Sequence, residues 1–355
     1  MRAIIKSLLT AGLLLTIPVA SFAQKTGWDS LNQEVLTLTL KGDFSTARPK
    51  AEEALKLAEK TYGRSHLRTA QSLNNLAFVY LNQNQLPIAE TLLVRALKIF
   101  DKKPSAETSD RVQALNSLAR IYASQKAAAK AESLFNRALL IIQKSTVPDS
   151  LQFAQTLNNF AGLYTGQGKF SQAESLCRLS LIIREKTVGP ESPATRQTLD
   201  NLIYLCARQE KYPDAESLTQ QALKIAGKFK KLYPLETANY QNSQGTFCHL
   251  QQKFAKAETL FQSALALREK NLGPENPMVA KTLDNLAEAR KGQKKYKGLD
   301  SLYERIVKIL EKNSGPENPA VVEKLEAIAR FYESIGQDKT AKKWAARAER
   351  ARPKQ

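Results

Sequence analysis

The chain has 355 residues, a formal net charge of +19, a hydrophobic fraction of 43% and a charged fraction of 25%. These are ordinary values for a globular protein and exclude a largely disordered chain. The basic residues are spread along the chain without a run of five, and no Arg-rich stretch alternates with aromatic residues. We therefore expect a solvated basic exterior and not a nucleic-acid binder.

The first 23 residues differ from the rest of the chain. Arg2 and Lys6 precede a short apolar run, and the small residues Ser21 and Ala23 follow it. This order is typical of a secretory signal peptide cleaved after Ala23. An uncleaved anchor is the alternative, but a membrane-spanning helix needs roughly 20 apolar residues. We expect an exported protein, periplasmic or extracellular, without an integral membrane span.

A repeat of 42 residues fills the remainder. Its marker is the leucine of "LNNLA", found at Leu31, Leu73, Leu115, Leu157, Leu199, Leu283 and Leu325, with Gln241 in the sixth place. Fixed self-similarity of this length indicates a solenoid. We expect one solenoid over residues 24–355, in eight units: 28–69, 70–111, 112–153, 154–195, 196–237, 238–279, 280–321 and 322–355.

Each unit should form two helices, A and B. In the second unit Leu73, Leu76, Ala77 and Tyr80 are spaced as one face of helix A. A turn follows, and it carries glycine in some units, where a positive φ would end helix A: Gly42, Gly168 and Gly336. An alanine in helix B allows close packing: Ala89, Ala131, Ala173, Ala215 and Ala257.

The units are separated by Gly- and Pro-containing segments, "GPESP" at 189–193 and "GPENP" at 273–277 and 315–319. Glycine and proline end one helix, and the second proline leads into the next. The last helix B is highly charged and has Trp344 where other units have leucine. We interpret it as the C-terminal cap that a solenoid needs.

The pattern "LNNLA..Y..QGKF..AE.L" resembles the tetratricopeptide repeat, in the 42-residue variant found in kinesin light chains and their bacterial relatives. The resemblance implies an all-α fold, a right-handed superhelical α-solenoid of eight two-helix repeats. The sixth unit departs most from the pattern, because "YQNSQGTFCHL" lacks the opening leucine. The first unit is also degenerate.

The resemblance also implies that helix A lines a concave groove that binds peptides. Amide side chains both donate and accept hydrogen bonds, so a row of them could hold an extended peptide backbone. The candidate groove residues are Asn32, Gln71, Asn74, Phe78, Gln113, Asn116, Arg120, Gln155, Asn158, Gln197, Asp200, Tyr204, Asn242, Lys281 and Asp284.

The asparagines occupy two neighbouring repeat positions. We name the position of Asn74 the first-Asn position, and it belongs to the candidate groove. The second-Asn position holds Asn75, Asn159, Asn201 and Asn285. It matches a scaffold position of the family, so we expect these amides to bond a neighbouring helix.

Residues for catalysis are scarce. His66 and His249 are the only histidines, and no HExxH, CxxC or Gly-rich phosphate loop occurs. We therefore expect no enzyme activity, no cofactor and no dedicated metal site. Cys206 and Cys248 occupy a core position, and a Cys177–Cys206 disulfide is conceivable in an exported protein.

The sequence thus favours an exported, non-enzymatic scaffold or adaptor that binds an extended segment of a protein partner. The alternative is a structural or self-assembling envelope protein that uses its stacking faces or its basic convex surface. The identity of the partner and the oligomeric state stay open.

Overall fold

The computed structural model describes residues 27–103, 108–145, 149–229 and 231–352. The predicted signal peptide, residues 1–23, lies outside them. The described residues form sixteen α-helices and no strand. The predicted all-α solenoid of two-helix repeats is confirmed.

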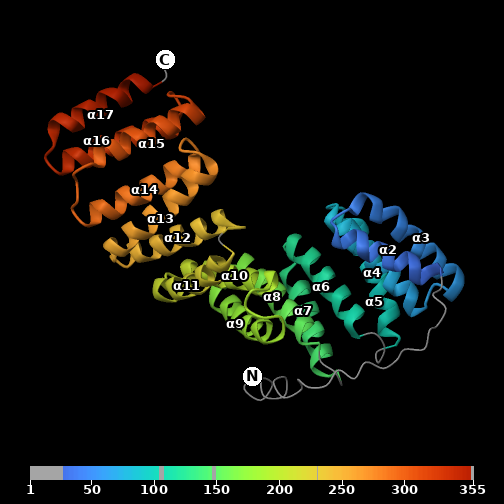
Figure 1. Cartoon of the computed structure of the whole chain (residues 1–355). Coiled ribbons are helices and arrows are strands. Elements are labelled where there is room, and N and C mark those ends of the chain that lie inside the picture. The colour runs from blue at the N-terminus through green and yellow to red at the C-terminus, as the bar shows by residue number, and fades with distance from the viewer. Residues whose placement is uncertain (1–26, 104–107, 146–148, 230, 353–355) are drawn as a thin grey trace. The chain divides into compact units, whose positions relative to one another are not determined.

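The helices alternate as A and B of successive repeats (Figure 1). The helices A are α2 (Gly27–Leu40), α4 (Leu67–Asn82), α6 (Thr108–Ser124), α8 (Ser150–Gly166), α10 (Pro193–Arg208), α12 (Pro234–Leu250), α14 (Pro277–Gly292) and α16 (Pro319–Ser334). The helices B are α3 (Phe44–Tyr62), α5 (Leu86–Asp101), α7 (Ala128–Gln143), α9 (Phe170–Thr187), α11 (Tyr212–Lys228), α13 (Phe254–Leu272), α15 (Leu299–Ser314) and α17 (Asp338–Ala351). The proline of each "GPE.P" segment is the first residue of the following helix A, where its missing N–H costs nothing.

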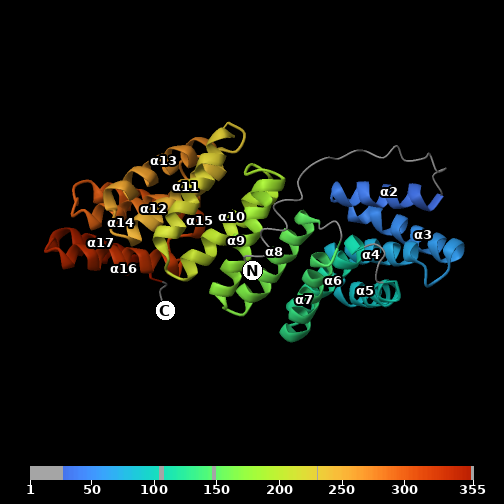
Figure 2. The ribbon, with the colours of Figure 1, turned by 90° about the horizontal axis from the view of Figure 1, so that it is seen from below.

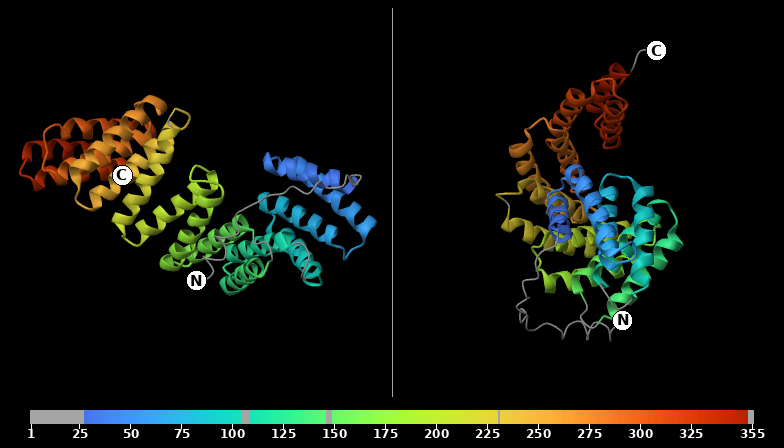
Figure 3. Two further views of the ribbon diagram at one scale, coloured as in Figure 1. Left: turned by 60° about the horizontal axis from the view of Figure 1, so that its bottom comes forward. Right: turned by 90° about the vertical axis from the view of Figure 1, so that its right-hand side faces the viewer.

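The chain groups into two compact units, Met1–Thr198 and Leu199–Gln355, and the boundary falls inside α10. We describe each unit by itself. Within a unit, consecutive helices form antiparallel hairpins, seen from other sides in Figures 2 and 3. The single solenoid over residues 24–355 stays a prediction.

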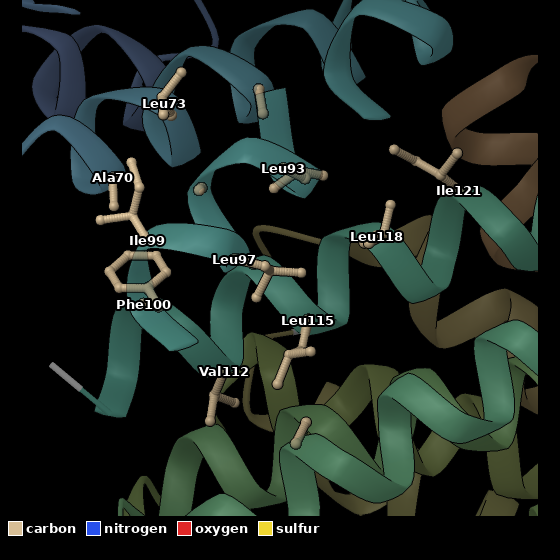
Figure 4. Close-up of a cluster of buried hydrophobic side chains, with 14 of the residues drawn as sticks. Ala70, Leu73, Leu93, Leu97, Ile99, Phe100, Val112, Leu115, Leu118 and Ile121 are labelled. Carbon is tan, nitrogen blue, oxygen red and sulfur yellow. The ribbon is translucent and has the colours of Figure 1, made fainter. Parts of the chain in front are cut away.

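The core lies between the two helices of a hairpin and between neighbouring hairpins. Figure 4 shows this in the first unit, where Leu73, Leu93, Phe100 and Leu115 are fully buried. The predicted close-packing alanines are also fully buried, each with an exposed fraction of 0%: Ala89, Ala131, Ala173, Ala215 and Ala257. A larger side chain at those positions would push the paired helices apart.

A left-handed residue ends every helix A. The positive-φ residues of this turn are spaced by 42: Gly42, Asn84, Lys126, Gly168, Glu210, Gln252, Lys294 and Gly336. The next residue donates its N–H back across the turn, as Gln85 does to the Tyr80 carbonyl at 2.9 Å. This Schellman-type closure satisfies carbonyls that the helix end leaves open. The predicted glycine turns are confirmed, and five units adopt the same turn without glycine.

A glutamate of helix B bonds the end of the next helix A. In the first unit the Glu90 carboxylate accepts from Gln125 at 2.9 Å, and that of Glu132 accepts from the Tyr164 hydroxyl at 2.9 Å. In the second unit Glu258 accepts from Arg290 at 2.9 Å. We call this contact the glutamate clamp. It belongs to the "AE" of the repeat pattern and joins adjacent repeats.

The strongest glutamate clamp surrounds Glu216 in the second unit. Its carboxylate accepts from Lys253 at 2.8 Å, from Lys256 at 2.6 Å and from Gln251 at 2.9 Å. Burial alone would raise the pKa of this carboxyl, but the hydrogen bonds from Lys253, Lys256 and Gln251 outweigh it and lower the pKa to about 2. The charged form is thus strongly favoured in the folded protein.

A buried tryptophan anchors the first and the last described helix pair. Trp28 donates its indole N–H to the Ser72 hydroxyl at 2.8 Å, and Trp344 donates to the Asp300 carboxylate at 2.7 Å. Trp344 has an exposed fraction of 0% and lies on the highly charged α17, whose Arg347 pairs with Glu304. This is the arrangement expected of a cap, with one face buried and the other solvated. The two tryptophans also give each unit its own fluorescent probe.

The turn geometry predicts opposite changes in stability at the turn positions of two adjacent repeats, where one substitution introduces glycine and the other removes it. Lys126→Gly should raise the free energy of unfolding by about 0.5–1 kcal/mol, because it relieves a left-handed non-glycine residue. Gly168→Ala should lower it by about 1 kcal/mol, although nothing lies within 4 Å of an added Cβ, since only φ opposes the change. The measurement is urea unfolding followed by the fluorescence of Trp28 in a Trp344→Phe background.

Asn136→Gly provides the control, because Asn136 is an exposed residue inside α7. Glycine there should lower stability by roughly 0.5–1 kcal/mol, as in any helix interior. Equal effects of glycine at 126 and 136 would contradict the assignment of strain to the turn.

The Glu216 clamp predicts acid sensitivity of the second unit. Its folded pKa of about 2 lies below the ordinary value of 4.5, so its stabilisation is complete above pH 4.5 and is lost as pH falls toward 2. Glu216→Gln should lower stability at pH 7 by about 2 kcal/mol and reduce the loss between pH 4.5 and 2. Urea unfolding at a series of pH values, followed by Trp344 in a Trp28→Phe background, measures this.

Glu317→Gln removes an exposed carboxylate of the same unit and serves as the control. It should leave the pH profile as in the parent chain. If the pH profile of Glu216→Gln also matched that of the parent chain, the Glu216 clamp would not stabilise the second unit.

Candidate peptide-binding face

Two repeat positions of helix A point their side chains outward. Because they are seven residues apart, or two helical turns, they lie on one side of the helix. We call the exposed surface that they form the helix A face. In the first unit it comprises Gln71, Gln113, Gln155 and Gln197, with Leu36, Phe78 and Arg120; in the second unit it comprises Asn239, Lys281 and Glu323, with Tyr204, Thr246, Glu288 and Arg330.

The structure exposes several of the predicted groove residues on this face. Gln113, Arg120 and Gln197 are exposed in the first unit, as is Gln155. In the second unit Lys281 is exposed and the Tyr204 side chain has an exposed fraction of 51%. Gln71 and Phe78 are half-buried, and the Phe78 ring packs against Phe44 with centroids 6.4 Å apart. These side chains remain candidates for contact with a ligand.

The first-Asn position behaves differently in the first unit. Asn74, Asn116 and Asn158 have exposed fractions of 1%, 6% and 8%. The amide of Asn74 donates to the Gln113 side chain at 3.2 Å, and that of Asn116 donates to the Thr156 hydroxyl at 2.8 Å. The expectation that these three amides face an open groove is thereby corrected, because all three are buried, and Asn74 and Asn116 bond the next helix A.

At four other repeats, the side chain at the first-Asn position accepts a hydrogen bond from a side chain of the next helix A. Asn75 donates to Asn32 at 2.6 Å, and Asn285 donates to Asn242 at 3.1 Å. At the second-Asn position, Asn75 and Asn285 therefore bond a neighbouring helix as predicted, whereas Asn159 accepts from Gln155 of its own helix at 2.9 Å. Asp200 accepts from the Tyr240 hydroxyl at 2.7 Å, and Asp284 accepts from Lys324. We call these bonds from one helix A to the next the asparagine clasp; they explain why the repeat keeps poor helix formers.

Two buried arginines donate hydrogen bonds from the protein interior to residues of the helix A face. Arg184 donates to the Gln155 side chain and to the Thr198 hydroxyl, both at 2.6 Å. Arg268 holds the same place two repeats later and donates to Asn239 at 2.9 Å and to Thr282 at 2.5 Å. Burial lowers the pKa of both guanidinium groups. Gln155 and Asn239 are thus fixed in position before any ligand arrives.

These arginines were missed in the sequence. Charged side chains are mostly exposed, and a basic residue near the C-terminal end of a helix is already explained by its favourable interaction with the helix dipole. Nothing in such a position suggests a buried side chain. The available signal was a threonine 14 residues later in both cases, Thr198 after Arg184 and Thr282 after Arg268.

His66 and Cys177 serve the fold. The His66 ring accepts from the Arg68 backbone N–H at 3.2 Å and caps α4. The three cysteines are buried and no disulfide joins them, so the Cys177–Cys206 disulfide that seemed conceivable is not formed. Burial raises the pKa of the Cys177 thiol to about 12, which leaves it protonated and unreactive at neutral pH. Among the helices described, none combines the length and apolar character needed to cross a bilayer.

Comparison with known proteins identifies the family. The sequence pattern described as "Tetratricopeptide repeat" matches residues 30–102, 110–176, 152–228 and 236–298. A search of the curated proteins found no match.

Solved structures share the fold at low sequence identity. BtubC (BKLC) from P. vanneervenii is 21% identical with a TM-score of 0.51, over 66% of this chain and 92% of that one. The apo form of RapI is 14% identical with a TM-score of 0.61, over 91% and 97%. A Rap protein complexed with competence and sporulation factor is 16% identical with a TM-score of 0.52, over 84% and 76%. The pattern match extends over more than half of the sequence, and the chain therefore belongs to the tetratricopeptide repeat family.

Proposed function

We propose that the chain is a non-enzymatic scaffold or adaptor that binds an extended segment of a partner protein along the helix A face. The tetratricopeptide repeat fold supports a role in protein–protein interaction, and proteins of this family are generally non-enzymatic scaffolds. The Rap protein solved with competence and sporulation factor has a similar fold, so such a fold accommodates a ligand.

The observation that carries the proposal is the regular row of outward side chains on helices A. Gln71, Gln113, Gln155 and Gln197 place one side-chain amide per repeat on the face of the first unit. Three of them also bond within the protein: Gln71 donates to Asp110, Gln113 accepts from Asn74 and Gln155 accepts from Arg184. Packed helices lie about 8–10 Å apart, and an extended peptide advances about 3.3 Å per residue. One amide would therefore meet every third residue of a bound segment. Bonds to the peptide backbone make little demand on the partner's sequence.

The second unit adds charge to the face. Lys281 and Glu323 stand where the first unit has glutamines. Glu288 and Arg330 stand at the position of Phe78 and Arg120, where Tyr204 offers an aromatic surface. Exposed charges contribute little affinity, but they determine orientation and reject partners of the wrong charge. We assign general backbone binding to the first unit and discrimination between partners to the second.

We further propose that the protein acts in the cell envelope after export. The support is the sequence of residues 1–23, with Arg2 and Lys6, an apolar run and small residues before the cleavage position. The adaptor would then meet its partner in the periplasm or outside the cell.

Self-assembly is the second candidate, because helices B of the first unit expose apolar side chains. Leu140 and Ile182 occupy the same repeat position and have exposed fractions of 54% and 43%. Single exposed apolar residues are common, so two of them favour this function less than the row on helix A favours binding.

The proposal predicts loss of partner capture when the face is truncated. In affinity capture from envelope extract with residues 24–355 as bait, a Gln113→Ala, Arg120→Ala, Gln197→Ala variant should lose most of the captured partner. Arg120 and Gln197 are exposed, and loss of the Asn74–Gln113 hydrogen bond should cost only about 1 kcal/mol, so the variant should stay folded, which urea unfolding checks.

A Gln143→Ala, Gln172→Ala, Lys186→Ala variant is the matched control, since it removes two amides and one cation from exposed positions of helices B. It should capture as the parent chain does. Equal capture by both variants would refute binding on the helix A face, and a concentration-dependent oligomer with no captured partner would favour self-assembly.

A further inference from the structure

A basic hollow lies in the first unit between the loop after α3 and the side of α5. It encloses about 480 Å³ and is lined by Arg64, Ser65, Arg95, Lys98, Ile99 and Lys102. Arg95 pairs with Glu59 at 2.5 Å. Arg64, Lys98 and Lys102 are exposed and make no ion pair with the residues that the structure describes. The hollow thus gathers three cations that no described carboxylate neutralises.

The same hollow recurs five repeats later, in the second unit, where it encloses about 210 Å³. Arg305 replaces Arg95 there and pairs with Glu269 at 2.5 Å, as Arg95 pairs with Glu59. Lys308 replaces Lys98, Lys312 replaces Lys102 and Pro274 replaces Arg64. The two hollows therefore share their framework and can be compared side chain by side chain.

They differ in one decisive residue. Where the first hollow has Ser65, the second has Glu275, whose carboxylate accepts from the Lys312 ammonium. The hydrogen bond from Lys312 lowers the pKa of Glu275, which keeps that carboxylate charged. The second hollow supplies its own anion, and the first, with a hydroxyl at this position, does not.

The fold does not require every basic residue of the first hollow. A third hollow at the same repeat position in the second unit keeps Lys270 in the place of Lys102, and Lys228 and Lys231 also line it. Leu232 stands in the place of Arg64, and Ala266 stands in the place of Lys98. Packing therefore does not require Arg64 and Lys98, and we look for their role in binding.

We propose that the basic hollow around Ser65 binds a carboxylate side chain of an acidic segment of a partner protein. The Glu275 carboxylate shows which chemical group this framework holds when the chain provides it. Arg64, Lys98 and Lys102 would surround the incoming group with charge-assisted hydrogen bonds. The site is formed by a loop and a helix B, so it is separate from the helix A face and does not depend on the function proposed for that face.

The test measures fluorescence anisotropy of a labelled peptide of alternating Glu and Gly, titrated with the mature chain at low salt. Ser65→Glu places a carboxylate where Glu275 lies and should weaken binding by roughly tenfold or more. Ser133→Glu adds the same charge at an exposed position of α7 and should change affinity less than about twofold. Lys98→Gln with Lys102→Gln should weaken binding as Ser65→Glu does.

The peptide with Gln in place of Glu should not bind measurably to the parent chain. Equal weakening by Ser65→Glu and Ser133→Glu would show that only net charge attracts the peptide, and would overturn the site. Inorganic phosphate that binds the parent chain more tightly than the Glu peptide, and loses affinity in Ser65→Glu, would overturn the assignment to a carboxylate.

Discussion

The left-handed residue that ends every helix A is the constraint on which the rest of the structure depends. Because it recurs every 42 residues, each helix B leaves its helix A in the same direction. Glycine makes this conformation easy, but Lys126, Glu210 and Lys294 adopt it at a steric cost. The Schellman-type hydrogen bonds and the packing of the hairpin must offset that cost at each non-glycine turn.

With the register fixed, polar contacts between adjacent repeats can recur. The glutamate clamp joins a helix B to the end of the next helix A, as between Glu132 and Tyr164. The asparagine clasp joins one helix A to the next, as between Asn75 and Asn32. Each contact reaches only its neighbour, so stability should arise from individual hairpins and the interfaces between them. The surfaces left over, the helix A face and the loop hollows, are free to vary from repeat to repeat.

The sequence predicted the fold well because its signals are local and repeated. The 42-residue step, the marker leucines and the buried alanines follow from periodicity alone, and the predicted bond to a neighbouring helix is confirmed for Asn75 and Asn285. The first-Asn position was not, because helical spacing gives the direction of Asn74 relative to its own helix only. Its burial depends on how closely the next helix A approaches, which one repeat does not specify.

Two further features could not be predicted from the repeat in the sequence. Arg184 and Arg268 are buried against neutral acceptors, although the composition of a basic chain suggests a solvated side chain. The relation between Ser65 and Glu275 appears only when equivalent hollows are compared in three dimensions, because one residue out of 42 carries the difference. Repeat proteins offer such internal comparisons, in which one repeat shows what another lacks.

The central claim is that the exposed helix A face, and not the buried asparagines or helix B, contacts the partner. Photocrosslinking tests it most directly, with a benzoylphenylalanine placed at Gln113 or Arg120 on helix A and at Gln143 on helix B in a protein of residues 24–355. In envelope extract the account predicts a discrete adduct from positions 113 and 120 and none from 143. Adducts from position 143 alone, or identical adducts from all three positions, would contradict it.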